Sequence, residues 1–148
     1  KIQSMHGNIG GKMVIFYSKV CGEIFEELLR SIGDILPAED LLLCKDTGEL
    51  SREICRPGGR KAIVVLLVAG EDDFTDLLSI RDQLWDVKII LIMYSSHPDT
   101  ILQGHLLNPR FLSSCDSNYL ECVSVLKRML NNTSAGGSKP DKSMKKKK

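Results

Sequence analysis

The sequence lacks any hydrophobic run long enough to cross a membrane. A membrane-spanning helix needs roughly 18 or more consecutive apolar residues, and the longest run here, Ala62–Ala69, has the length of a buried strand. The first residues also lack the apolar segment of a secretory signal peptide. We therefore expect a cytoplasmic protein without a membrane span.

The chain also lacks the cysteine spacing of disulfide frameworks and zinc sites. Its five cysteines are an odd number, and no two of them form a Cys-x-x-Cys pair. Both facts favour reduced thiols, as in the cytoplasm. The histidines show no metal-ligand spacing with cysteines or carboxylates. We expect neither a metal ion nor another cofactor.

Charge is distributed unevenly along the chain. Residues 1–131 carry 14 basic and 18 acidic side chains, whereas residues 132–148 carry six lysines and one aspartate. A mildly acidic domain argues against a specific nucleic-acid-binding face. We expect residues 1–12 to be a flexible leader, residues 13–131 to form a single domain, and residues 132–148 to be a disordered, lysine-rich tail.

Strand-like and helix-like segments alternate within residues 13–131. Short, almost uniformly apolar runs are typical of parallel strands that are buried on both faces. Right-handed connections between them predict a three-layer α/β/α sandwich with a five-stranded parallel sheet of order 2-1-3-4-5, the flavodoxin-like arrangement. The expected strands are 13–17, 41–44, 62–68, 87–93 and 110–113.

Helices are expected between these strands, where apolar residues recur at helical spacing. Ser18 is expected to cap the first helix, which Pro37 ends. Trp85 is placed on the apolar side of the third helix, which begins near Phe74. The last helix is expected over residues 118–130.

The pattern resembles the receiver domain of bacterial response regulators. Ala62–Val68 and Asp86–Met93 resemble the third and fourth receiver strands, and Phe111–Cys115 resembles the fifth. Asp46–Leu50 resembles the opening of the second receiver helix. The resemblance covers residues 13–131 and implies a role in two-component signal transduction.

A working receiver uses five side chains at the ends of its strands. Two acidic residues hold Mg²⁺, an aspartate accepts the phosphoryl group, and a hydroxyl and a lysine contact that group. Mg²⁺ prefers carboxylate oxygens, the acceptor must be a carboxylate, and the new charge needs a cation. None of the residues that the resemblance places here has this chemistry. These degenerate positions are Tyr17, Ser18, Val68, Met93 and Ser114.

The resemblance therefore implies a pseudo-receiver, a non-enzymatic module that binds proteins without aspartyl phosphorylation. Its partner would be a signalling protein, such as a kinase or another regulator, or a second copy of the chain. Receivers commonly pair through the face made by the fourth helix, the fifth strand and the fifth helix. The corresponding candidates are Leu102, His105, Arg110, Tyr119 and Lys127.

Two alternatives stay open. Asp72 and Asp73 could act as substitute phosphoacceptors of an unorthodox receiver, although acidic residues at that place also favour the start of a helix. Alternatively, the mouth between the first and third strands could bind a small molecule or nucleotide, as flavodoxins do. Ser18, Cys21 and Asp72 are the candidates for that mouth.

Overall fold

The apolar segments form one parallel sheet of order β2-β1-β3-β4-β5. The computed structural model describes residues 14–57 and 61–135. The order and direction of the strands are confirmed, and each strand boundary lies within a residue of its expected place. The strands are β1 (Val14–Ser18), β2 (Leu41–Cys44), β3 (Ile63–Leu67), β4 (Lys88–Met93) and β5 (Phe111–Ser114).

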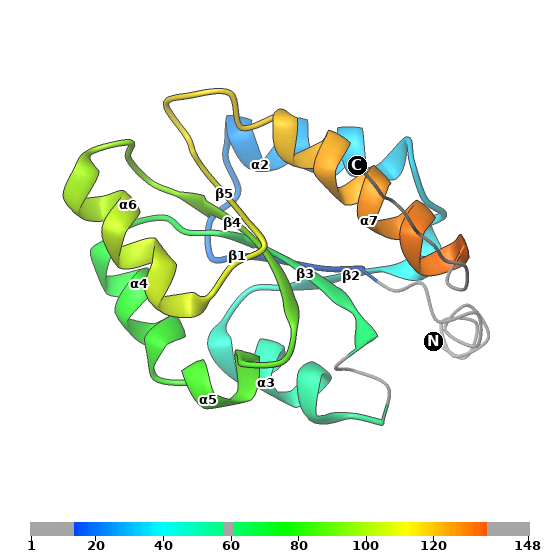
Figure 1. The fold of residues 1–148 in the computed structure, drawn as a ribbon, viewed down its shortest axis with the longest axis horizontal. Helices are drawn as coiled ribbons and strands as arrows, with labels where there is room; N and C mark the ends of the chain where they lie inside the picture. The colour runs from blue at the N-terminus through cyan, green and yellow to red at the C-terminus, as the bar shows by residue number, and fades with distance from the viewer. Residues whose placement is uncertain (1–13, 58–60, 136–148) are drawn as a thin grey trace, which may run out of the picture.

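Helices cover both faces of the sheet, which gives the expected three layers (Figure 1). One face carries α2 (Glu23–Gly33) and α7 (Glu121–Ala135). Two short 3₁₀ turns, η1 (Ala38–Asp40) and η3 (His105–Leu107), complete the connections. The opposite face carries α3 (Thr47–Cys55), α4 (Glu71–Leu78), α5 (Arg81–Leu84) and α6 (Pro98–Gly104).

Two apolar cores explain why the strands are hydrophobic at nearly every position. Successive strand residues face opposite sides of a sheet, so Ile15 packs under the α3–α6 layer and Phe16 packs under α2 and α7. The rings of Phe16 and Phe25 stack with centroids 5.3 Å apart. Within the described residues, no helix has the length and apolar character needed to cross a membrane.

The first helix begins later than a cap at Ser18 would require. Gly22 precedes α2 and offers no side-chain cap. Ser18 is the last residue of β1, and its hydroxyl donates a 2.6 Å hydrogen bond to the carbonyl of Val20 instead. The prediction that Ser18 caps this helix is wrong because a loop separates the strand from the helix.

The remaining helices differ from expectation at two places. The helix expected to run from Phe74 to Trp85 is divided into α4 and α5, because the backbone leaves the helical region at Ile80 (φ −110°, ψ 20°). Trp85 is 56% exposed and is therefore not a core residue. The last helix, α7, begins at Glu121 and continues to Ala135, into the segment expected to be a tail. Residues 1–12 and 136–148 lie outside the described residues.

Candidate functional site

The carboxyl ends of four neighbouring strands meet at one edge of the sheet. β1 lies beside β3 with Ser18 paired to Leu67, and β4 lies beside β5 with Met93 paired to Ser114. The degenerate receiver positions gather along this edge, and all are buried. Their exposed fractions are 0% for Tyr17, 3% for Ser18, 0% for Val68, 0% for Met93 and 2% for Ser114.

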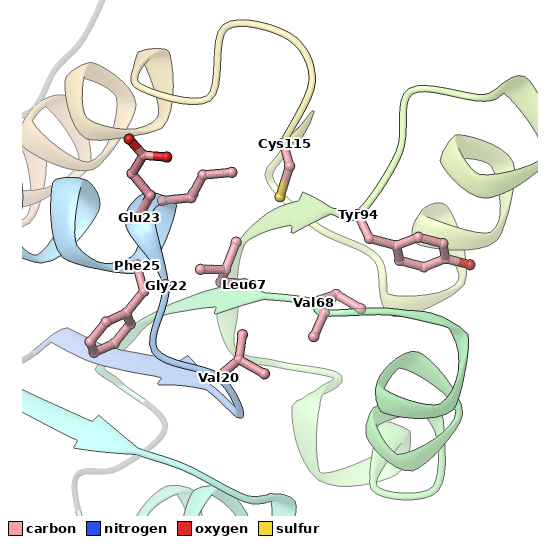
Figure 2. A pocket seen from close by; sticks show the side chains of 10 residues that line it. Val20, Gly22, Glu23, Phe25, Leu67, Val68, Tyr94 and Cys115 are labelled. Carbon is pink, nitrogen blue, oxygen red and sulfur yellow. The ribbon is translucent and has the colours of Figure 1, made fainter.

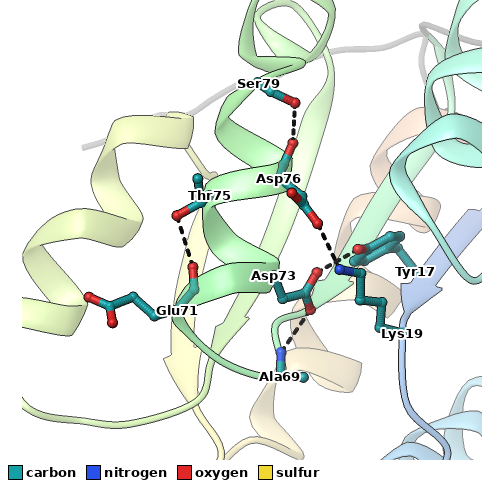
Figure 3. A network of polar contacts seen from close by, with 8 residues as sticks. All are labelled: Tyr17, Lys19, Ala69, Glu71, Asp73, Thr75, Asp76 and Ser79. Carbon is teal, nitrogen blue, oxygen red and sulfur yellow. Dashed lines mark hydrogen bonds and ion pairs between the residues drawn. The ribbon is translucent and has the colours of Figure 1, made fainter.

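Tyr17 is bonded to the buried carboxylate of Asp73 (Figure 3). The Tyr17 hydroxyl donates to Asp73 Oδ1 over 2.6 Å, and the Ala69 N–H donates to Asp73 Oδ2 over 2.9 Å. Burial, followed by the bond to Asp73 and the negative charge of that carboxylate, raises the pKa of Tyr17 far above its usual value. Both carboxylate oxygens of Asp73 therefore have donors within the protein.

Asp73 also accepts a backbone hydrogen bond at the N-terminus of α4. It is the third residue of that helix, and its side chain reaches back to an N–H that precedes the helix, as in a capping box. Asp73 is 4% exposed. Asp72, by contrast, is exposed, as is Glu71 beside it. The two candidate phosphoacceptors thus have different surroundings, and only Asp72 faces solvent.

The only lysine at this part of the edge, within the described residues, is already paired. Lys19 Nζ lies 2.7 Å from Asp76 Oδ2 on α4 (Figure 3). This bond raises the pKa of Lys19. No ion pair holds Glu71 or Asp72 among residues 14–57 and 61–135. The first turn of α4 therefore presents to solvent more negative charge than Lys19 offsets.

Ser114, which the resemblance pairs with the receiver lysine, belongs to a hydrogen-bond network of the loops. Its hydroxyl donates to Asp116 Oδ1 over 2.9 Å and lies 3.0 Å from Ser117 Oγ. The Ser96 N–H donates to Asp116 Oδ2 over 3.3 Å. These bonds lower the pKa of Asp116. Ser114 thus joins the loops that follow β4 and β5, and it brings no cation to the site.

An apolar groove of about 420 Å³ opens at the same edge, between the N-terminus of α2 and the ends of the strands (Figure 2). Among the residues that line the groove, Glu23 carries a charge. Cys115 also lines it, and burial raises the pKa of the Cys115 thiol. Its volume falls in the range of about 300–1,000 Å³ that is usual for ligand sites. The apolar groove is lined by Val20, Gly22, Glu23, Ile24, Phe25, Leu67, Val68, Ala69, Tyr94 and Cys115.

A second depression of about 380 Å³, the acidic hollow, adjoins the apolar groove at Ala69. Of the residues expected at a small-molecule mouth, only some line these two depressions. Asp72 lines the acidic hollow, whereas Ser18 and Cys21 line neither depression. The acidic hollow is lined by Lys19, Ala69, Gly70, Glu71, Asp72 and Asp73.

The expected partner face is formed by α6, β5 and α7, with both helices packed against β5. Leu102 on α6 is 69% exposed, and His105, Arg110 and Lys127 are also exposed. Tyr119 is placed differently: its hydroxyl donates to Glu27 on α2, and its ring packs on the core beneath α2 and α7.

One apolar residue of this face was not predicted from the sequence, and neither was the apolar groove. Leu106 lies one turn after Leu102 and is 44% exposed. The exposed Val20 in the first loop was a signal for the groove, because an apolar residue there has no periodic pattern to join. Among the described residues, no group of three or more histidine, cysteine or acidic side chains is placed to hold a metal ion.

Comparison with known proteins supports the fold. Neither the protein-family models nor the curated proteins include a match to this sequence. A protein from Burkholderia pseudomallei described as related to pilus assembly is similar in structure, with a TM-score of 0.59, 12% identity and coverage of 89% of this chain and 96% of that one. A response regulator receiver domain from Rhodospirillum rubrum has a TM-score of 0.57, 12% identity and coverage of 83% and 94%. The chain has a receiver-like fold.

Proposed function

We propose that this protein is a receiver-like protein-interaction module of bacterial signal transduction, which acts without aspartyl phosphorylation and is not an enzyme. The bond between Tyr17 and the buried Asp73 carries the proposal. Tyr17 is a residue that the resemblance pairs with a Mg²⁺ ligand of a receiver, and its hydroxyl is committed to Asp73 instead. A cytoplasmic location and a signalling protein as partner are parts of the same proposal.

The absence of a suitable acceptor supports a phosphorylation-independent role. Phosphoryl transfer to a carboxylate needs a free nucleophilic oxygen, a metal to neutralise the phosphate, and a cation to stabilise the product. Asp73 has donors on both oxygens, Val68 is a buried aliphatic residue, and Ser114 carries no charge. Asp72 is exposed, but the described residues offer it no metal-binding group of three ligands.

The exposed leucines of the α6–β5–α7 face support an interaction role. Leu102 on α6 and Leu106 on η3 are four residues apart and both exposed, so a partner that covers both would bury apolar surface. Receivers are switches that act through other proteins, and one structural neighbour is a receiver domain. We infer that a partner binds this face whether or not a phosphate is present.

The proposal is tested by titrating ¹⁵N-labelled protein with Mg²⁺ and then with beryllofluoride, a mimic of an aspartyl phosphate. We expect the amides of residues 68–73 and of Ser114 to keep their positions. Saturable shifts there would show a working phosphorylation site. The variants Asp72→Asn and Asp82→Asn form a matched pair, since both side chains are exposed and only Asp72 lies at the site. Shifts that Asp72→Asn alone abolishes would identify Asp72 as the acceptor and contradict the proposal.

A further inference from the structure

The apolar groove has a buried floor and an exposed apolar rim. Leu67 and Val68 at its floor are 3% and 0% exposed, whereas Val20 on its rim is 50% exposed (Figure 2). Tyr94, which is half-buried, lines the groove from the end of β4. Val68 and Tyr94 lie at or next to degenerate receiver positions. The edge of the sheet at which the resemblance places phosphorylation chemistry therefore carries apolar side chains, and Val20 and Tyr94 present part of them to solvent.

Negative charge borders this apolar surface. Glu23 lies in the groove lining, and Glu71 and Asp72 line the adjoining acidic hollow. All three side chains are exposed, and none is held by an ion pair among the described residues. Lys19 lines the acidic hollow and also feels the charge of Asp72, but it is bonded to Asp76, so one cation offsets only part of the negative charge there. A ligand that covers both depressions would need apolar groups and positive charges together.

We propose that the apolar groove and the acidic hollow form one docking site for a segment of a partner protein in which apolar side chains are flanked by lysines or arginines. The apolar side chains contact the exposed Val20 and the half-buried Tyr94, and the cationic groups lie beside Glu23, Glu71 and Asp72. The two depressions share Ala69 in their linings, so a ligand that reaches both must extend past this residue, which favours an extended peptide over a compact small molecule. This inference rests on the proposed role in protein interaction and adds the chemistry of a partner at a second surface, apart from the α6–β5–α7 face.

Charge complementarity accounts for the partner's chemistry. Charged groups around an interface mainly set specificity and the rate of association, whereas buried apolar contacts supply affinity. The apolar rim residue Val20 therefore anchors the segment, and the carboxylates select a basic one. Because Glu71 and Asp72 are exposed, their contribution falls as salt screens it.

The test uses the full chain and a short, amidated, fluorescein-labelled peptide in which two leucines are flanked by lysines. Fluorescence anisotropy gives the dissociation constant, and ¹⁵N spectra locate the site. One control peptide replaces the leucines by serine, and the other replaces the lysines by glutamate. We expect the probe to bind about tenfold or more tightly than either control, with shifts at Val20, Val68, Glu71 and Tyr94.

Two variants test the site, and a third serves as their control. Val20→Asp and the double variant Glu71→Lys/Asp72→Lys should each weaken probe binding about tenfold. The double variant Asp82→Lys/Asp86→Lys changes charge equally at exposed positions away from the groove and should bind normally. Since Val20, Glu71 and Asp72 are exposed, these substitutions should leave the fold intact.

Several results would overturn the inference. Equal binding of the serine peptide would show that charge alone attracts it, and shifts confined to Leu102 and Leu106 would place it elsewhere. If replacing the lysines of residues 145–148 by serine raises probe affinity about tenfold, the chain's own end occupies the site. If the ¹⁵N signals of the site shift with protein concentration when no peptide is present, a second copy of the chain occupies the site instead. An unresponsive beryllofluoride titration combined with absent peptide binding would remove this inference and leave the proposed function standing.

Discussion

Replacing Tyr17 by phenylalanine removes one hydroxyl from a fully buried side chain and leaves its ring in place. Asp73, which is 4% exposed, then keeps the N–H of Ala69 as its donor and loses the 2.6 Å bond from Tyr17. Hydrogen bonds to charged groups contribute about 1.5–3 kcal/mol, and a buried acceptor that loses its donor carries the desolvation cost. We expect Tyr17→Phe to lower the free energy of unfolding by about 2 kcal/mol near pH 8.

The cost of Tyr17→Phe should shrink at high pH. Burial and the Asp73 carboxylate raise the pKa of Tyr17 in the folded protein, whereas a tyrosine of the unfolded chain titrates near pH 10. The folded state therefore keeps this proton when the unfolded state has lost it. Stability from Tyr17 is complete below about pH 10 and falls by about 1.4 kcal/mol per pH unit above it. Near pH 11 the difference between the proteins should be about 0.6 kcal/mol.

The measurement is urea unfolding of both proteins from pH 7 to pH 11 under reducing conditions, followed by circular dichroism. Tyr94→Phe is the matched control, because Tyr94 lies at the same edge of the sheet and no hydrogen bond to its hydroxyl is found among the described residues. The control should change stability by less than about 0.5 kcal/mol. A Tyr17→Phe variant as stable as the parent, or a difference that stays constant to pH 11, would refute the assigned role of the Tyr17–Asp73 bond.

Other perturbations test the packing and the helix ends. Gly104→Ala should destabilise the protein by about 1–3 kcal/mol in thermal melts, because its Cβ would lie 3.0 to 3.2 Å from side chains packed against α6. Burial raises the pKa of Cys44 and Cys122 to about 12, so these thiols should resist a thiol reagent at pH 8 in native protein while the exposed cysteines react, as mass spectrometry would show. Asp46→Ala should cost about 1 kcal/mol in urea unfolding, since the Asp46 side chain caps α3 by accepting the N–H of Glu49; an unchanged midpoint would contradict the cap.

The architecture could be predicted because its signals are local and strong. The run at β3, buried at every position, admits few alternatives to a central parallel strand, and the right-handed rule for crossovers then limits the strand order. Helix ends were harder to predict because they depend on competing hydrogen bonds. The Ser18 and Ser79 hydroxyls each bond a nearby carbonyl, and propensity alone does not reveal which carbonyl that is.

The proposed loss of phosphorylation chemistry was predicted from the sequence, whereas the contacts at the site were not. Residue identity alone excludes Val68 as an acceptor and Ser114 as a cation. The separation of Asp72 from Asp73 required the fold, because Tyr17 is far from them in sequence and reaches only Asp73. The apolar groove arises from several strand ends and α2 together, and no single segment carries a pattern that predicts it.

Restoring the acceptor alone should not restore phosphorylation. Val68 is completely buried within the core beneath α3–α6, so Val68→Asp places an unpaired carboxylate there at a cost of several kcal/mol. Tyr17 and Ser18 would still offer Mg²⁺ no carboxylate, and Ser114 would still supply no cation. We expect a lower melting temperature, a smaller loss for the similarly shaped control Val68→Thr, and no phosphorylated species by mass spectrometry after incubation with acetyl phosphate and Mg²⁺. Phosphorylation of Val68→Asp would mean that Glu71 or Asp72 already completes a metal site. The loss of receiver chemistry would then rest on one residue, and the buried Tyr17–Asp73 pair would not be its cause.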